Sequence, residues 1–392
     1  GTWKQMLAIS LVLLVPGAAS FGIRLGVQSQ PTALRLVSRA SPMLSEPVTG
    51  CSGERVVVVG ASGYIGKAVV KEAVRRGYPT TAVVRDRAKF SSEPKFEGAT
   101  VNEADVCDPS ALVSDSGPLK KGAVDVVISC LASRSGSKKD SYAIDYQATL
   151  NCLNAAREAG ARHFVMLSAF CVKSAERNDP YALQFQYAKM DMEAALRGQD
   201  DVTYSILRPT AFFKSVSGQL EVVEGGAPFV FFDLGNGKSA TCNPISEPDL
   251  AAAIIDTITE KSRENTVWNI GGPDVGLSMQ QQGALIADVL GKEEAKTLGV
   301  PIVIFDVIIN ALQWLATTFK SEKLEDAAEF GRIGRYYALE DMLTTEPSDK
   351  YGSTTLREHY ERIAVDGQEY DPYTSVFGSK AAKEAFKEEV KS

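Results

Sequence analysis

One stretch constrains the fold more than any other: a glycine-rich turn between an apolar run and an amphipathic segment. The apolar, β-branched run Arg55–Val59 is typical of a buried parallel strand. It leads directly into Gly60–Gly66 (GASGYIG), and a helix is expected over Lys67–Arg76, stopped by Gly77. A second strand is expected over Thr80–Val84. This order of strand, glycine turn, helix and strand predicts an α/β fold, a doubly wound parallel sheet with helices on both faces.

The glycine spacing indicates what the turn binds. Glycines let the backbone turn tightly and approach a pyrophosphate, whose charge is favoured at a helix N-terminus. A tight turn without a ligand is the alternative, but the position between a strand and a helix favours a dinucleotide site. The GxxGxxG spacing resembles that of extended and atypical short-chain dehydrogenases. We therefore expect a Rossmann-type NAD(P)-binding fold in which the turn supplies these cofactor contacts: Gly60, Ser62, Gly63, Tyr64, Ile65 and Gly66.

The residue after the second strand indicates which nicotinamide cofactor is used. Enzymes that use NAD place an acidic residue there, roughly 20 residues beyond the turn, to bind the ribose hydroxyls. Here the position holds Arg85, followed by Asp86 and Arg87. A guanidinium group can form paired hydrogen bonds with the 2′-phosphate of NADP. Arg85 therefore favours NADPH over NADH, although Asp86 leaves an acidic group close by.

The resemblance to short-chain dehydrogenases implies further cofactor contacts at the ends of later strands. Asp105, after the third strand, corresponds to the adenine contact. The fourth strand is expected over Val124–Cys130, and the loop after it flanks the nicotinamide side in relatives. That loop holds the predicted contacts Leu131, Ala132 and Ser133.

The predicted catalytic region departs from the short-chain dehydrogenase pattern. That pattern pairs a serine after strand five with Tyr-x-x-x-Lys on the next helix, where the tyrosine acts as an acid and the lysine also holds the ribose. Ser168 and Lys189 match the serine and the lysine, and both are predicted to be catalytic. The tyrosine position, on a helix expected over Tyr181–Leu196, holds Phe185, and no Tyr-x-x-x-Lys occurs in the chain. Either the protein is not catalytic, or its reaction needs no acid on oxygen, as in reduction of a carbon–carbon double bond. For Lys189 alone, a solvated helix lysine is the alternative.

Several longer runs of the chain are more specific than the cofactor motifs. They are Asp125–Arg134, Lys139–Ser141, Ile144–Leu153, Phe185–Lys189, Arg208–Ser215 and, as the most specific, Leu324–Tyr337. These runs resemble one family, the divinyl chlorophyllide 8-vinyl reductases. The likeness covers about residues 54–362, and that family also has Phe in place of the catalytic Tyr. It implies reduction of the 8-vinyl group of divinyl chlorophyllide or protochlorophyllide to ethyl by NADPH.

Two apolar segments are candidates for contact with a pigment or a membrane. Phe212 and Phe213 follow strand six on the usual substrate side and are expected to stack on a flat macrocycle, with ordinary core packing as the alternative. Val300–Phe319 is apolar but is interrupted by polar residues, so it is not expected to span a membrane. A packed helix is the favoured interpretation, and peripheral contact with thylakoid lipid is the alternative.

The first fifty residues have the composition of a two-part targeting leader. Lys4 precedes the apolar run Met6–Val15 and a group of small residues, which predicts a signal peptide over about residues 1–20. From Phe21 the chain is rich in Arg and Ser and has no acidic residue before Glu46, which predicts a transit peptide over about residues 21–50. The combination resembles leaders of algae whose plastids derive from a secondary red-algal endosymbiont. We expect a complex plastid; a disordered N-terminus is the alternative.

Composition narrows the remaining possibilities. Lys plus Arg number 42 against 49 Asp plus Glu, and a net charge of −7 argues against binding nucleic acid. Two histidines and six cysteines without paired spacing predict no zinc or iron–sulfur site. The expected organisation is the leader (1–50), an NADP-binding domain with substrate-side insertions (51–300) and a C-terminal helical extension (301–392). Strand six and the residues after it are expected to form a C-terminal substrate region.

Two other functions stay open at this point. One is a non-catalytic NADPH-binding sensor or plastid assembly factor, as some atypical short-chain dehydrogenases are. The lost tyrosine favours this function, whereas Lys189 and the run Leu324–Tyr337 oppose it. The other is a reductase of flavonoid-like substrates, which the plastid leader disfavours.

Overall fold

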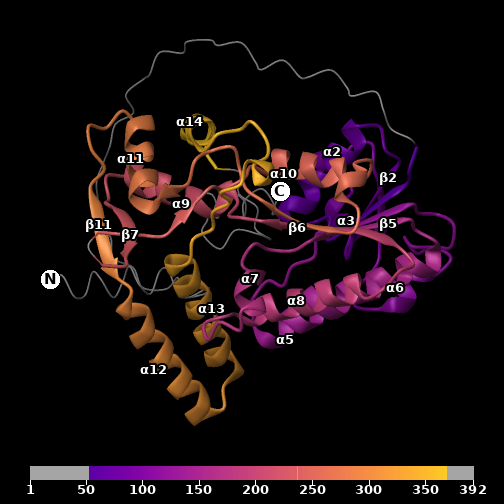
Figure 1. Cartoon of the computed structure of the whole chain (residues 1–392), viewed down its shortest axis with the longest axis horizontal. Helices are drawn as coiled ribbons and strands as arrows, with labels where there is room; N and C mark the ends of the chain where they lie inside the picture. Colours follow the sequence, from indigo (N-terminus) through magenta and orange to yellow (C-terminus); the bar gives the residue numbers. More distant parts are fainter. Residues whose placement is uncertain (1–52, 236, 369–392) are drawn as a thin grey trace. The chain divides into compact units, whose positions relative to one another are not determined.

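A computed structural model describes residues 53–235 and 237–368, so the predicted leader and the charged tail after residue 368 lie outside the described residues. One sheet has seven strands: β1 (Val56–Val59), β2 (Thr80–Val84), β3 (Thr100–Glu103), β4 (Val126–Ser129), β5 (His163–Leu167), β6 (Thr203–Pro209) and β9 (Thr266–Ile270). Their spatial order is β3-β2-β1-β4-β5-β6-β9, with all neighbours parallel (Figure 1). The predicted doubly wound parallel sheet is confirmed, with its switch point between β1 and β4.

Helices cover both faces of this sheet. Val56 and Val58 of β1 pack with α2 (Tyr64–Arg75) and α10 (Glu247–Asp256), whereas Val57 and Val59 point to the opposite face. The alternation follows from the two-residue period of a strand, and burial on both faces explains the uninterrupted apolar run. The other face carries α4 (Pro109–Val113), α6 (Thr149–Ala159) and α8 (Gln184–Arg197). Shorter helical segments are α3 (Arg87–Phe90), η1 (Pro94–Phe96), α5 (Lys138–Ser141), η2 (Tyr142–Ala148), α7 (Val172–Glu176), η3 (Lys261–Arg263) and η4 (Pro347–Asp349).

A second, smaller core lies beyond the sheet. It is built from α9 (Phe213–Glu224), β7 (Phe229–Asp233), α11 (Met279–Val289) and α14 (Leu356–Asp366), with Phe213, Leu220 and Tyr360 buried together. β7 pairs in parallel with β11 (Thr297–Pro301), and β8 (Thr241–Cys242) pairs antiparallel with β10 (Leu277–Ser278). Helix α14 therefore completes a core that residues before 300 begin. The domain boundary at residue 300 falls inside β11 and stays a prediction.

Helices α12 (Val303–Phe319) and α13 (Glu322–Leu339) form a hairpin, seen at the lower left of Figure 1. They pack closely where Gly334 of α13 meets the ring of Phe305: a Cβ at Gly334 would lie 3.0 Å from it. Lys320 adopts a left-handed backbone with φ of 49° where α12 ends. Within residues 53–235 and 237–368, no helix has the length and apolar content needed to cross a membrane.

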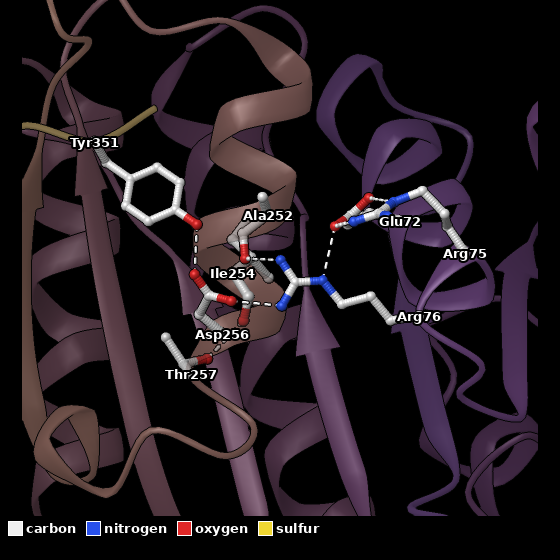
Figure 2. A network of polar contacts seen from close by, with 8 residues as sticks. All are labelled: Glu72, Arg75, Arg76, Ala252, Ile254, Asp256, Thr257 and Tyr351. Carbon is white, nitrogen blue, oxygen red and sulfur yellow. Dashed lines mark hydrogen bonds and ion pairs between the residues drawn. The ribbon is translucent and has the colours of Figure 1, made fainter. Parts of the chain in front are cut away.

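A polar network joins the end of α2 to α10 and to the segment before α14 (Figure 2). The Arg76 guanidinium lies 2.5 Å from Asp256 Oδ1 and 2.7 Å from Glu72 Oε1. The Tyr351 hydroxyl donates a hydrogen bond to the other Asp256 oxygen. Three segments distant in sequence are thus held together at one end of the fold.

Both histidines are structural. His163 of β5 is fully buried between the hydroxyls of Thr203 and Ser205. His359 of α14 is also buried, with its Nε2 atom 2.7 Å from Ser217 Oγ. Burial lowers the pKa of each from 6.5 to about 4, because the charged imidazolium would lose its hydration.

Folding stability should therefore decrease as the pH falls from 6.5 towards 4. The unfolded chain takes up a proton on each histidine near pH 6.5, whereas the folded chain resists protonation until about pH 4. Each histidine should lower the free energy of unfolding by up to about 3 kcal/mol over this interval. Urea denaturation at pH 7 and pH 4.5 measures the effect. A His163→Asn/His359→Gln variant should lose less stability between these pH values; an equal loss would contradict the assignment.

Candidate active site

The glycine turn lies at the carboxyl edge of the sheet, next to the end of β4. Gly60 has φ of 72°, and a Cβ there would lie 2.7 Å from the carbonyl carbon of Cys130. A Cβ on Gly66 would lie 2.2 Å from the Gly60 oxygen, so α2 packs directly on the turn. Helix α2 begins three residues earlier than expected because Gly63 acts as its N-cap. Gly63 has no side chain to cap the helix, so the N-terminus of α2 fits the pyrophosphate of a dinucleotide.

The predicted cofactor residues of β2 and β3 lie at adjacent strand ends. Arg85 is exposed directly after β2, and Asp105 is exposed after β3, its neighbour in the sheet. Asp86 points elsewhere: its carboxylate accepts a hydrogen bond from the Lys89 backbone N–H at 3.3 Å and lies 3.4 Å from Lys89 Nζ. Asp86 is therefore the N-cap of α3, which accounts for an acidic residue next to Arg85. Asp105 accepts from the Cys107 N–H at 3.0 Å.

The loop after β4 is held by two carboxylates. The backbone N–H of Ser133 donates to Asp145 Oδ2 at 3.3 Å, and that of Arg134 donates to Asp140 Oδ2 at 2.8 Å. The predicted nicotinamide-side residues 131–133 lie beside the glycine turn, because β4 pairs with β1. Gly136 has φ of 68° and lies under α13, where its Cβ would be 2.5 Å from Ile333 Cδ1.

Lys189 reaches the same edge of the sheet from α8. Its side chain is buried, and Nζ lies 3.0 Å from Asp145 Oδ1. The ammonium also donates to the carbonyl oxygens of Leu131 and Leu167, each at 3.4 Å, which places it between the ends of β4 and β5. Lys189 is thus not a solvated helix lysine. Its position fits the ribose of a cofactor whose pyrophosphate lies on the glycine turn.

Ser168 follows β5 as predicted, but its hydroxyl belongs to a buried ionic network. It donates to Glu193 Oε1 at 2.5 Å, and Glu193 is fully buried. Arg208 binds the same carboxylate with Nε at 2.9 Å and also pairs with Glu176 at 2.5 Å. The catalytic role of Ser168 stays a prediction. Sequence patterns did not identify Glu193, although Arg208 lies in a run that carries the family resemblance.

Phe185, at the position of the lost tyrosine, packs in an apolar cluster. Its neighbours include Leu183, Cys171 and, from α13, Ile333 and Tyr336. Helix α8 begins at Gln184, three residues later than the sequence suggested, because the Asp179 carboxylate turns the chain by accepting from the Tyr181 N–H at 2.9 Å.

The specific run of α13 holds the start of α8. Glu329, itself buried, accepts a hydrogen bond from the backbone N–H of Gln184 at 3.3 Å. Arg332 holds Glu329 at 2.6 Å, and the Tyr336 hydroxyl lies 2.6 Å from Ser174 Oγ. The sequence identified this run as the most specific part of the family resemblance, but it did not show which residues the run contacts. The structure shows that it docks the hairpin on the helix that carries Lys189.

The two predicted pigment residues differ in exposure. Phe213 is fully buried in the small core, with its ring 4.8 Å from that of His359. A side chain packed in this way has no surface left for a pigment, so the predicted contact does not fit Phe213. Phe212 is half-buried, and its ring lies 6.3 Å from that of Tyr64 in the glycine turn.

In the described part of the chain, no three His, Cys, Asp or Glu side chains gather as a metal site would require.

Residues 60–261 match the protein family described as NAD(P)H-binding, which agrees with the geometry at the glycine turn. Fold and site thus define a nicotinamide-cofactor-binding protein of the Rossmann type. The divinyl chlorophyllide a 8-vinyl-reductase of Arabidopsis thaliana, named as chloroplastic, is 44% identical over 80% of this chain and 77% of its own length. The enzyme of the same name from Zea mays is 43% identical over 84% of this chain and 83% of its own length. The chain belongs to the divinyl chlorophyllide a 8-vinyl-reductase family.

More distant likenesses show the fold. AtPrR2, solved with NADP+ and (+)-pinoresinol, superposes with a TM-score of 0.59 at 17% identity, covering 80% of this chain and 100% of that one. The photosystem II assembly factor Ycf39 of Synechocystis is 26% identical over 43% of this chain and 48% of its own length. The likeness to an assembly factor is thus shorter and weaker than that to the reductases.

The contact between α13 and α8 can be tested with Glu329→Gln. The variant keeps the shape of the side chain but removes the charge that binds Arg332 and the Gln184 N–H, and it should lower the free energy of unfolding by about 1–3 kcal/mol. Glu325→Gln, an exposed position on the same helix, is the matched control and should change stability by less than about 0.5 kcal/mol. Equal effects in urea denaturation would show that Glu329 does not hold α8.

Proposed function

We propose that this chain reduces the 8-vinyl group of a divinyl chlorophyllide to an ethyl group with NADPH. The main support is Lys189, buried at the carboxyl edge of the sheet beside the glycine turn, together with family membership at 43–44% identity. Phe185 fits this chemistry, because hydride and proton both go to carbon and no oxyanion needs an acid. Divinyl protochlorophyllide is the alternative pigment.

Different residues of the chain would bind the cofactor and orient the pigment. A bound nicotinamide supplies the hydride. The N-terminus of α2 would hold the pyrophosphate, and Lys189, between the ends of β4 and β5, would hold the ribose. The loop 131–133 borders the nicotinamide side, and Phe212 offers an aromatic surface near the turn. Together these residues would place the pigment's vinyl group against the nicotinamide ring and keep water from it.

A non-catalytic NADPH-binding sensor or plastid assembly factor is the second candidate. The observation in its favour is the apolar packing around Phe185, which leaves the position of the catalytic tyrosine without a hydroxyl. The identity of 43–44% to the reductases, against 26% over 43% of this chain for the assembly factor, argues against it. Turnover of pigment separates the two functions.

The choice of NADPH rests on Arg85. Its side chain is exposed at the end of β2, where the 2′-phosphate of NADP would lie, and Asp86 is occupied with capping α3. The carboxylate of Glu103, from the end of β3, also lies here and accepts a hydrogen bond from the Arg87 backbone N–H at 2.8 Å.

A peripheral membrane contact is proposed for α12. One face of this helix packs on α13, and the other exposes Val303, Val307 and Trp314; Phe319 is exposed at the last position of the helix. Tryptophan at such a surface suits the interface between lipid and water.

The proposed location is the plastid, supported by the chloroplastic relatives; entry into a complex plastid through a signal and a transit peptide rests on composition alone.

Replacing Arg85 by Asp should weaken NADPH binding and spare or improve NADH binding. The phosphate loses its charged partner, and a lost charge-assisted pair costs about 1.5–3 kcal/mol, roughly ten- to a hundredfold in Kd. Arg87→Asp, two residues further on, should have a smaller effect because Arg87 begins α3. Fluorescence titration with both cofactors measures this. An unchanged Kd for NADPH in Arg85→Asp would mean that another residue binds the phosphate.

A protein that begins at residue 51 should convert divinyl chlorophyllide to its monovinyl form with NADPH alone, without added metal or flavin. Lys189→Ala should weaken NADPH binding and slow turnover together, whereas Lys71→Ala, an exposed lysine of α2, should do neither. Phe185→Tyr should gain nothing, because the reaction has no oxygen to protonate. Chromatography of the pigments follows the product. Binding of pigment and NADPH without product would favour the sensor; unchanged turnover in Lys189→Ala would remove that residue from the site.

A further inference from the structure

A buried carboxylate next to the candidate active site is absent from the pattern that identified Ser168 and Lys189. Glu193 lies on α8, one turn after Lys189, and its side chain is fully buried. Both of its oxygens bind Arg208: Nε lies 2.9 Å from Oε1, and Nη2 lies 2.5 Å from Oε2. A guanidinium group is always charged, so its partner in this paired contact is a carboxylate.

The Ser168 hydroxyl is a further group that binds this carboxylate. Its Oγ atom lies 2.5 Å from Glu193 Oε1. A carboxylate has no proton to give, so the serine is the donor, and a hydroxyl has a single hydrogen. Ser168 therefore offers only its lone pairs to any other group, and lone pairs accept hydrogen bonds.

The surrounding contacts hold this arrangement in place. The backbone N–H of Ser168 donates to the Leu207 carbonyl oxygen at 2.8 Å, which fixes the end of β5 against β6. Arg208 is held from its other side by Glu176 of α7, with Nη2 2.5 Å from Oε1. Because Glu193 and Arg208 are both buried, water has little access to the carboxylate and does not replace the Ser168 hydroxyl.

Ser168 lies where the nicotinamide end of the cofactor is expected. It directly follows Leu167, whose carbonyl oxygen accepts a hydrogen bond from Lys189 Nζ at 3.4 Å. Strand β5 also pairs with β4, the strand that leads into the loop 131–133. A group that meets the Ser168 oxygen at this place has to carry an N–H or an O–H.

The chemistry of the cofactor and the pigment narrows the choice of donor. The ring nitrogens of a chlorophyllide bind magnesium and carry no hydrogen, and the amino group of adenine lies at the far end of the cofactor. The ribose hydroxyls are assigned to Lys189 in the proposed function. The remaining donor is the amino group of the nicotinamide carboxamide.

We propose that Glu193 fixes Ser168 as a hydrogen-bond acceptor and that Ser168 receives the carboxamide N–H of the bound nicotinamide. Ser168 then binds the cofactor, and Glu193 is its positioning residue. Such a bond would fix the rotation of the nicotinamide ring about its bond to the ribose and so decide which face of the ring meets the pigment. This inference rests on the proposed function for the identity of the cofactor and of the pigment.

The test compares the binding of NADPH with that of its 3-acetylpyridine analogue, in which a methyl group replaces the amino group of the carboxamide. Both are titrated into the full chain by calorimetry. The unmodified protein should bind NADPH about five- to tenfold more tightly, because the analogue leaves Ser168 without its hydrogen bond. Ser168→Ala should bind the two about equally, because NADPH has then lost the same bond.

Ser174→Ala is the matched control for Ser168→Ala. Ser174 is a buried serine of α7 whose hydroxyl contacts Tyr336, so its loss should leave the preference for NADPH unchanged. A preference that survives in Ser168→Ala, or that the unmodified protein lacks, would overturn the proposal.

A second variant tests Glu193 itself. Glu193→Leu alone would leave Arg208 buried without this partner, so it is combined with Arg208→Met, which removes both buried charges. The Ser168 hydrogen is then released and can turn to the carbonyl oxygen that both cofactors carry, so the preference should fall to about twofold or less. An unchanged preference would show that Glu193 does not set the role of Ser168.

The ratio of the two Kd values distinguishes this role from a structural one. Partial unfolding of a variant weakens the binding of both cofactors by the same factor and leaves their ratio unchanged. Because the readout is binding, failure of vinyl reduction would count against the proposed function and would leave this inference standing.

Discussion

The site depends on a contact between the ends of β1 and β4 that a side chain would prevent. A Cβ on Gly60 would lie 2.7 Å from the carbonyl carbon of Cys130, and one on Gly66 would overlap the Gly60 oxygen. Because these glycines let the turn, α2 and β4 meet, the helix N-terminus and the loop after β4 share one edge at the switch point of the sheet. The carbonyl of Leu131 then becomes an acceptor for Lys189, which arrives from α8.

Local sequence patterns predict the part of the fold that is built from elements adjacent in the chain. The β-branched runs, the glycine spacing and the positions of Arg85 and Lys189 led to the doubly wound sheet and its cofactor edge. The same patterns did not separate Phe212 from Phe213, because adjacent aromatic residues look alike until burial assigns one to the core. Ser168 was placed correctly after β5, but the carboxylate that engages its hydroxyl lies 25 residues away.

Pairs distant in sequence could not be predicted, and they determine how the site is held. Glu329 reaches the start of α8 across 145 residues, and Asp145, in the π-helical turn Tyr142–Ala148, forms an ion pair with Lys189 of α8 at 3.0 Å. No periodicity signals either contact in advance. Both segments carry the family resemblance, and both contact α8, Glu329 at its beginning and Asp145 at Lys189.

The apolar packing around Phe185 has a consequence for chemoselectivity. A pigment of the chlorophyllide type carries carbonyl groups as well as a vinyl group, and nicotinamide hydride can in principle add to either. Hydride addition to a carbonyl needs an acid at the developing alkoxide, and Phe185, packed against Leu183 and Cys171, offers none. Reduction of a vinyl group forms no alkoxide: its proton goes to carbon and has to come from a donor other than residue 185. Discrimination between the two kinds of double bond would then come from a missing hydroxyl, with no need for a dedicated recognition pocket.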